Sequence, residues 1–132
     1  MKVLIVEDEM LVALNMAAIL EDAGHEPVGI AADSAAAFQL VTFAPDVAFV
    51  DVNLRDGPTG PVIGERLARQ WGMPVVFVTA NPRQLGEGVP GTLGVLPKPT
   101  DDEELLAALA FATAAGAPPA GFQPFTRTSL SA

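Results

Sequence analysis

The 132-residue sequence contains no cysteine and only one histidine, His25, and these two absences exclude several kinds of functional site. Without cysteine there is no disulfide framework, no thiolate zinc site and no cysteine nucleophile. His25 follows Gly24 in a predicted turn, and we interpret it as a solvated loop residue, because a metal-binding histidine needs partner ligands. Any bound metal is therefore expected to be held by oxygen atoms.

Positive charge is also scarce. Lysine and arginine together number 7 against 16 aspartate and glutamate residues, which gives a formal net charge of −9. Because proteins bind phosphate backbones through lysine and arginine, we expect neither nucleic acid nor an anionic membrane as the partner. Only four apolar residues separate Lys2 from Glu7, too few for a signal peptide, and no apolar run reaches membrane-spanning length. The sequence therefore predicts a cytoplasmic protein.

Apolar residues are abundant and they alternate in two patterns. Half of the residues are hydrophobic, enough for the core of one domain. Short uninterrupted apolar runs, typical of strands buried on both faces, are each followed by a segment with helical spacing. The predicted strands span residues 3–6, 27–31, 47–50, 75–78 and 94–96. The predicted helices span residues 9–23, 34–43 with Ser34 as cap, 61 or 62 to 70, and a last one that Thr100 or Asp101 caps. This alternation predicts an α/β fold with a parallel sheet and helices on both faces.

Two segments depart from this regular pattern. Residues 82–91 contain three glycines and two prolines, so we expect the helix at this position to be short or irregular. Residues 116–132 are rich in proline, glycine, serine and alanine, which indicates a flexible tail after a domain of residues 1–115.

Polar residues follow four of the five predicted strands, where ligands bind in sheets of this kind. They are Glu7 and Asp8, Asp51, Thr79 and Lys98. Three carboxylates at one edge repel one another unless a cation neutralises them, and oxygen ligands of this kind suit Mg²⁺ or Mn²⁺. Each residue alone is typical of a strand end. Their coincidence favours a site in which a metal, an ammonium and a hydroxyl hold a phosphoryl group and Asp51 acts as the nucleophile.

The sequence resembles the receiver domains of two-component response regulators. The resemblance runs from residue 2 to about residue 115, and its motifs are highly specific in combination. They are Leu4-Ile5-Val6-Glu7-Asp8-Glu9, Asp51-Val52-Asn53-Leu54, Val78-Thr79-Ala80 and Lys98-Pro99. The resemblance implies a flavodoxin-like, doubly wound sheet of five parallel strands in the order 2-1-3-4-5.

The resemblance also implies roles for individual residues. Asp51 would accept a phosphoryl group from a phosphohistidine. Mg²⁺ would be bound by Asp8, Asp51 and the backbone carbonyl of Asn53, with Glu7 assisting through water. The phosphoryl oxygens would be contacted by Thr79, Lys98 and the backbone N–H of Ala80.

Several positions depart from the family pattern. Val95 stands where family members commonly carry a tyrosine or phenylalanine that rotates inward on activation, so an aromatic switch is not implied here. Arg55 replaces a frequent proline after the phosphoacceptor. Phe77-Val78-Thr79 weakly resembles a motif of a receiver subgroup tied to general stress signalling, from which the following Ala80-Asn81 departs.

Two helices carry more apolar residues than a core requires. On the first helix Met10, Leu11 and Leu14 lie beside the core stripe, and the resemblance implies docking of a histidine kinase or a histidine phosphotransfer protein there. The last helix has no charge after Glu104, which suggests a homodimer, a cover formed by Phe122 and Phe125 of the tail, or simply a flexible end. The composition of the tail slightly favours the last.

We therefore expect a single-domain response regulator that signals through an unknown downstream protein rather than an enzyme. The alternative is a pseudo-receiver that binds partners without phosphorylation. A phosphatase of the haloacid dehalogenase type would need an acid where Asn53 stands, because an amide cannot donate a titrating proton. A flavodoxin-like cofactor carrier would need a hydroxyl- and glycine-rich phosphate loop where Glu7, Asp8 and Glu9 stand.

Overall fold

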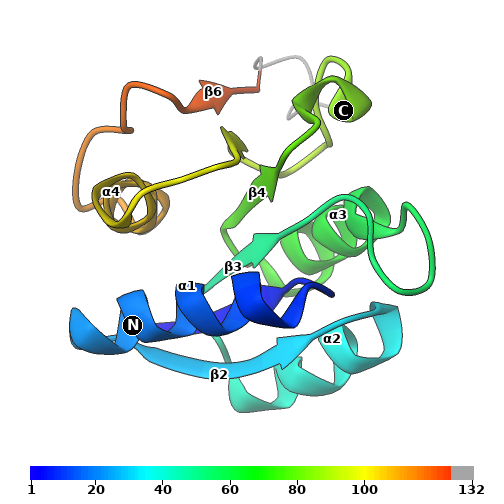
Figure 1. Cartoon of the computed structure of the whole chain (residues 1–132). Helices are drawn as coiled ribbons and strands as arrows, with labels where there is room; N and C mark the ends of the chain where they lie inside the picture. Colours follow the sequence, from blue (N-terminus) through cyan, green and yellow to red (C-terminus); the bar gives the residue numbers. More distant parts are fainter. Residues whose placement is uncertain (126–132) are drawn as a thin grey trace.

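The computed structural model describes residues 1–125, which form one twisted sheet with helices on both faces (Figure 1). The elements in chain order are β1 (Lys2–Val6), α1 (Met10–Asp22), β2 (Glu26–Ala31), α2 (Ser34–Leu40), the 3₁₀ turn η1 (Val41–Phe43), β3 (Val47–Val50), α3 (Gly60–Trp71), β4 (Val75–Thr79), the 3₁₀ turn η2 (Pro82–Leu85), β5 (Gly94–Pro97), α4 (Asp102–Ala112) and β6 (Gln123–Pro124). None of the helices within residues 1–125 is long and apolar enough to cross a membrane.

The strand order is β2-β1-β3-β4-β5-β6, and the first five strands run parallel. The predicted α/β class and the order 2-1-3-4-5 are thus confirmed. The predicted number of strands is wrong for residues 1–125, because β6 adds a sixth strand that pairs antiparallel with β5. A two-residue strand containing a proline carries no alternating pattern from which it could have been predicted.

Each central strand is buried on both faces, which explains its uninterrupted apolar sequence. Along β1, Val3 and Ile5 face a cluster formed with α1 and α4, whereas Leu4 and Val6 face a cluster formed with α2 and α3. The two pairs of helices accordingly lie on opposite sides of the sheet (Figure 1). The side chains of the central strands are therefore covered on both faces, whereas those of β2 are only partly buried and those of β6 are exposed.

The N-terminal caps of two helices can be compared with the sequence prediction, which was wrong for α2 and offered two residues for the last helix. The cap of α2 is Asp33, whose carboxylate accepts a hydrogen bond of 3.0 Å from the N–H of Ala36, and not the predicted Ser34. Ser34 instead donates its hydroxyl to Asp56 at 2.7 Å. Of the two predicted caps of the last helix, Asp101 is the one observed, in a reciprocal capping box with Glu104.

The segment after β4 is irregular, as the prolines and glycines predict. It forms only η2, four residues long, where a full helix would complete the alternating pattern. The segment is nevertheless anchored, because Leu85 and Val89 are buried in the α2–α3 side of the core. It thus lies fixed beside the end of β4.

Phe122 and the strand that follows it cover the edge of β5. Phe122 is only 7% exposed, and its ring lies 5.1 Å from that of Phe111 on α4. Gly94 on β5 makes room for it, because a Cβ atom there would lie 2.5 Å from the Phe122 ring. Phe122 thus covers α4 as one of the sequence-based expectations has it, whereas Phe125, the other residue of that expected cover, packs on the opposite side of the sheet.

Phe125 anchors the same segment on the other side of the sheet. Its N–H donates to the carbonyl of Leu93 at 3.1 Å, and its ring lies 6.2 Å from that of Phe77 on β4. Gly88 leaves space for this ring, because a Cβ atom there would lie 2.7 Å from it. The rest of the expected tail, residues 126–132, lies outside the described residues.

Candidate functional site

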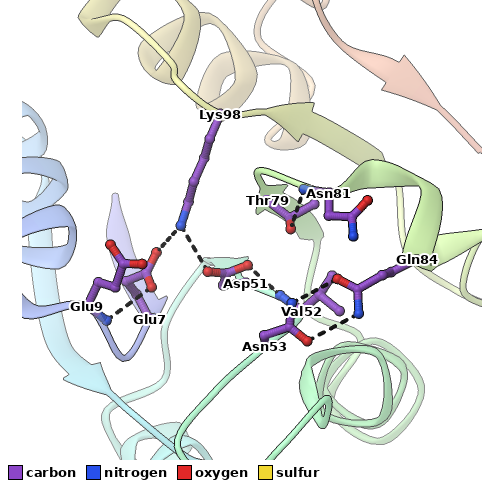
Figure 2. Close-up of polar contacts among 9 residues, drawn as sticks. All are labelled: Glu7, Glu9, Asp51, Val52, Asn53, Thr79, Asn81, Gln84 and Lys98. Carbon is purple, nitrogen blue, oxygen red and sulfur yellow. Dashed lines mark hydrogen bonds and ion pairs between the residues drawn. The ribbon is translucent and has the colours of Figure 1, made fainter.

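The residues predicted from the strand ends meet at one edge of the sheet (Figure 2). The register of the parallel strands explains why these residues lie close together. Val6 pairs with Val50, Val50 with Phe77, and Thr79 with Pro97, so the strands end at nearly the same level and the residues at their ends lie side by side. They surround a cleft of about 380 Å³. Its lining residues are Asp8, Glu9, Asp51, Asn53, Thr79, Ala80, Asn81 and Lys98.

Backbone hydrogen bonds fix these positions just beyond the strands. The N–H of Glu7 donates to the carbonyl of Ala31 at 2.8 Å, and the N–H of Asp51 donates to the carbonyl of Val6 at 2.9 Å. The N–H of Lys98 donates to the carbonyl of Thr79 at 2.8 Å. The functional side chains are therefore carried by backbone that is still tied to the sheet, which limits their movement.

Gly60 is a residue of the site's framework that the sequence analysis missed. A Cβ atom at Gly60 would lie 1.9 Å from the carbonyl oxygen of Asp51 and 2.7 Å from the Cα of Val52. The N–H of Gly60 donates to the carbonyl of Val52 at 3.0 Å. Glycine is thus required for α3 to begin directly against the segment that carries Asp51. A glycine beside a proline reads only as a turn in the sequence, so its neighbour could not be inferred.

Lys98 is the centre of the charge arrangement. Its Nζ lies 2.6 Å from Oε1 of Glu7 and 2.9 Å from Oδ2 of Asp51. The Glu7 side chain is only 2% exposed, and those of Asp51 and Lys98 are also largely buried. Two carboxylates from separate strands therefore share one ammonium, which gives short charge-assisted hydrogen bonds.

For both Glu7 and Lys98, burial and the hydrogen bonds of the side chain shift the pKa in opposite directions. Burial raises the pKa of Glu7, and its hydrogen bond to Lys98 only partly opposes that effect. Burial alone would lower the pKa of Lys98, but the hydrogen bonds to Glu7 and Asp51 outweigh it and raise the pKa. Lys98 is therefore held as a cation beside Asp51.

The acidic residues of the site have the composition of a hard-metal centre. Glu7, Asp8 and Asp51 each offer a carboxylate oxygen, and these oxygens lie within 4.8 Å of one another. Asp8 is exposed at the cleft and Asp51 is partly exposed, so both are open to an ion arriving from solvent. Oxygen-only donors of this charge fit Mg²⁺ or Mn²⁺.

The remaining polar groups define the walls of the cleft. Oδ1 of Asp51 accepts the N–H of Val52 at 2.7 Å, and Oγ1 of Thr79 accepts the N–H of Asn81 at 3.2 Å. Every predicted site residue except Glu7 lines the cleft, and Glu7 lies buried beneath Lys98. The side chain of Asn53 instead reaches Gln84 on η2, a residue that no motif in the sequence marks (Figure 2).

An apolar surface adjoins the cleft. Met10, Leu11 and Leu14 on α1 are more than half exposed, with Leu11 at 84%. A cavity of about 510 Å³ lies between α1 and the segment after β5, bounded on one side by Leu11 and on the other by Lys98 and Pro99. Exposed apolar side chains thus lie next to the charged site.

Comparison with known protein families decides what this arrangement represents. A family model described as the response regulator receiver domain matches residues 3–110. The chain belongs to this family. The receiver domain is a module of two-component signalling and not a classical enzyme, as the resemblance of the sequence motifs implies.

Curated relatives of this receiver domain are regulators of greater length. It is 32% identical over 89 residues to the phyllosphere-induced regulator PhyR of Methylorubrum extorquens, a match covering 66% of this chain and 33% of PhyR. It is 34% identical over 119 residues to the transcriptional regulatory protein PdtaR of Mycobacterium tuberculosis, covering 84% of this chain and 56% of PdtaR. The chain therefore spans a third to about half the length of these relatives.

Solved structures give the same result for the fold. The receiver domain of the Erythrobacter litoralis PhyR response regulator has a TM-score of 0.78 at 29% identity, covering 89% of this chain and 93% of that one. The anti-anti-sigma factor PhyR of Bartonella quintana has a TM-score of 0.73 at 28% identity, covering 84% of this chain and 46% of that one. The receiver fold is thus established over most of the chain.

Proposed function

We propose that this receiver domain accepts a phosphoryl group on Asp51 in a Mg²⁺-dependent reaction and signals through protein contacts. One observation carries the proposal: the Asp51 carboxylate lies at the cleft with Lys98 at 2.9 Å and within a group of three acids. A carboxylate flanked by a cation and by metal-ligating oxygens is suited to nucleophilic attack on phosphorus.

The donor in this proposal is a phosphohistidine. An oxygen of Asp51 attacks the phosphorus atom, the P–N bond breaks, and the imidazole nitrogen leaves with the bonding electron pair and takes up a proton. An acyl phosphate on Asp51 and a neutral histidine are the products. Lys98, whose hydrogen bonds to Glu7 and Asp51 raise its pKa, would be a cation beside the transferred phosphoryl group and would offset its charge.

The metal would be held by Asp8, Asp51 and the backbone carbonyl of Asn53, with Glu7 acting through water. When bound, Mg²⁺ supplies positive charge that offsets the charge of the phosphoryl oxygens. Thr79 would donate its hydroxyl and Ala80 its backbone N–H to two other phosphoryl oxygens. Both residues line the cleft, which supports these assignments.

We propose that both the phosphodonor and the downstream partner are proteins. A histidine kinase or histidine phosphotransfer protein would place its helices against Met10, Leu11 and Leu14, which are exposed on α1, and Leu11 lines a cavity that Lys98 also lines. The downstream partner is also a protein, because a formal net charge of −9 disfavours nucleic acid. The anti-anti-sigma factor PhyR of Bartonella quintana, a relative of similar fold, supports an output of this kind.

The deciding experiment is intact-mass measurement after incubation with Mg²⁺ and phosphoramidate as a small phosphodonor. We expect one added phosphoryl group on the parent chain and none on Asp51→Asn or in the presence of a chelator. Asp46→Asn is the matched control, because Asp46 is exposed and precedes β3, whereas Asp51 follows it. A parent chain that gains no mass from phosphoramidate or from kinases, and binds no Mg²⁺, would instead be a pseudo-receiver.

A further inference from the structure

Two side-chain amides join η2 to the loop that follows Asp51. The NH₂ of Asn53 donates to Oε1 of Gln84 at 2.8 Å, and the NH₂ of Gln84 donates to Oδ1 of Asn53 at 3.2 Å (Figure 2). Each amide thus serves as donor and acceptor toward the other, which fixes the orientation of both. We call this pair the amide clasp.

A second hydrogen bond ties the segment around η2 to the site. At the start of η2 the N–H of Asn81 donates to Oγ1 of Thr79 at 3.2 Å. Leu85, the last residue of η2, and Val89 beyond it are buried in the core, so the segment has a fixed base from which Gln84 reaches toward the cleft. The polar side of η2 is therefore held by the two residues it touches at the strand ends.

Gln84 influences the cleft through Asn53 and does not line it. Asn53 forms part of the cleft wall two residues after Asp51, whereas Gln84 is absent from that wall. With the amide clasp formed, the Asn53 side chain is drawn toward η2 and one wall of the cleft is fixed. Without it, the Asn53 side chain can rotate, and the polar side of η2 loses its attachment to the loop after Asp51 while Leu85 stays buried in the core.

We propose that Gln84 is a positioning residue that closes η2 against Asn53 and thereby limits the access of phosphodonor and water to Asp51. This inference rests on the proposed function, because it concerns the rate at which Asp51 gains and loses a phosphoryl group. Gln84 is uncharged, so its effect is expected to be steric and orientational and to persist at high salt, unlike that of a charged group.

The test measures two rates in a double-substitution cycle of Gln84→Ala and Asn53→Ala. The first is Mg²⁺-dependent phosphorylation by phosphoramidate, and the second is loss of the phosphoryl group after the donor is removed. We expect Gln84→Ala to raise both rates by about threefold, a modest factor because both hydrogen bonds of the amide clasp are exposed to solvent. In a chain that already carries Asn53→Ala, the same substitution should have no further effect.

Two further variants separate a positioning role from a general loss of structure. Exchanging the two side chains, as Asn53→Gln with Gln84→Asn, keeps both amides and their summed length, so hydrogen exchange of residues 81–88 should return close to that of the parent. Gln39→Ala removes an exposed glutamine from α2 and should leave both rates unchanged. Parent-like rates in Gln84→Ala, or an undiminished effect when Asn53 is already alanine, would overturn the proposal.

Hydrogen exchange of residues 81–88 tests the amide clasp without phosphorylation. Gln84→Ala and Asn53→Ala should each speed exchange by the same factor, and the double variant should add nothing. Equal exchange in parent and variants would overturn the amide clasp itself. A parent that takes up no phosphoryl group while the exchange result holds would overturn the proposed function, and with it the effect on access, but would leave the contact intact.

Discussion

The ammonium of Lys98, directly after β5, donates to the carboxylate of Glu7, 91 positions earlier in the chain, at 2.6 Å. The same nitrogen donates to Asp51 at 2.9 Å, so one cation serves two carboxylates that follow separate strands. Glu7 is the more deeply buried of the two. The ion pair is therefore a structural element of the site as well as a candidate for its chemistry.

Removal of Lys98 should destabilise the fold mainly through Glu7. We expect Lys98→Met to lower the free energy of unfolding by about 2 kcal/mol, because Glu7 is left without its partner and must be buried uncompensated or take up a proton. Urea unfolding of the parent and the variant measures this difference in the free energy of unfolding. In Glu7→Gln/Lys98→Met most of the loss should be recovered. Lys2→Met, at the opposite end of β1, is the control. An equal loss with or without Glu7 would contradict this account.

Binding of Mg²⁺ should stabilise the folded chain. A ligand at 100 times its dissociation constant raises the free energy of unfolding by about 2.7 kcal/mol when it binds only the folded state. We expect an increase of this kind in the parent, reversed by a chelator and absent in Asp8→Asn, which removes a ligand oxygen charge. Asp22→Asn changes an exposed acid at the end of α1 and should respond as the parent does. Equal stabilisation of Asp8→Asn and the parent would count against this site.

The parts of the molecule that were predictable from sequence are those that a local pattern of residue types determines, such as buried strands and the polar residues that follow them. The apolar runs of β1, β3 and β4 are buried on both faces, as uninterrupted runs indicate. Because the carboxyl ends of parallel strands meet at one edge, the alternation of strands and helices was enough to predict that Asp51 and Lys98 lie at the same edge, and the resemblance supplied the strand order.

The parts that were not predictable depend on contacts between distant residues. The sequence 121–125 is apolar and polar in no regular period, yet Phe122 is buried because Gly94 leaves space for its ring. Gln84 is one exposed glutamine among several, and only its distance to Asn53 distinguishes it. In both cases the partner lies about 30 residues away, beyond the reach of local patterns.

The cover over β5 should contribute measurably to stability. We expect Phe122→Ala to cost about 3 kcal/mol in the free energy of unfolding, since it removes a buried aromatic ring and leaves a cavity against Phe111. Phe43→Ala is the matched control, because Phe43 is 56% exposed and its loss should change stability far less. Thermal or urea unfolding compares the two. Similar small losses in both variants would show that the segment after α4 contributes little to the fold.

Asp56 should titrate well below the ordinary range of aspartate. Hydrogen bonds from the hydroxyls of Thr59 and Ser34, at 2.6 and 2.7 Å, lower its pKa from 3.8 to about 2. Both bonds favour the charged carboxylate, so their stabilising effect is complete above pH 3.8 and is lost as the pH falls toward 2.

Carboxyl carbon shifts of Asp56, recorded by NMR between pH 2 and 5, should give a titration midpoint at about 2. In Ser34→Ala/Thr59→Ala the midpoint should move up toward 3.8. The double variant should also lose less stability than the parent as the pH falls through this window. An unchanged midpoint would show that the two hydroxyls are not what holds the Asp56 carboxylate in its charged form.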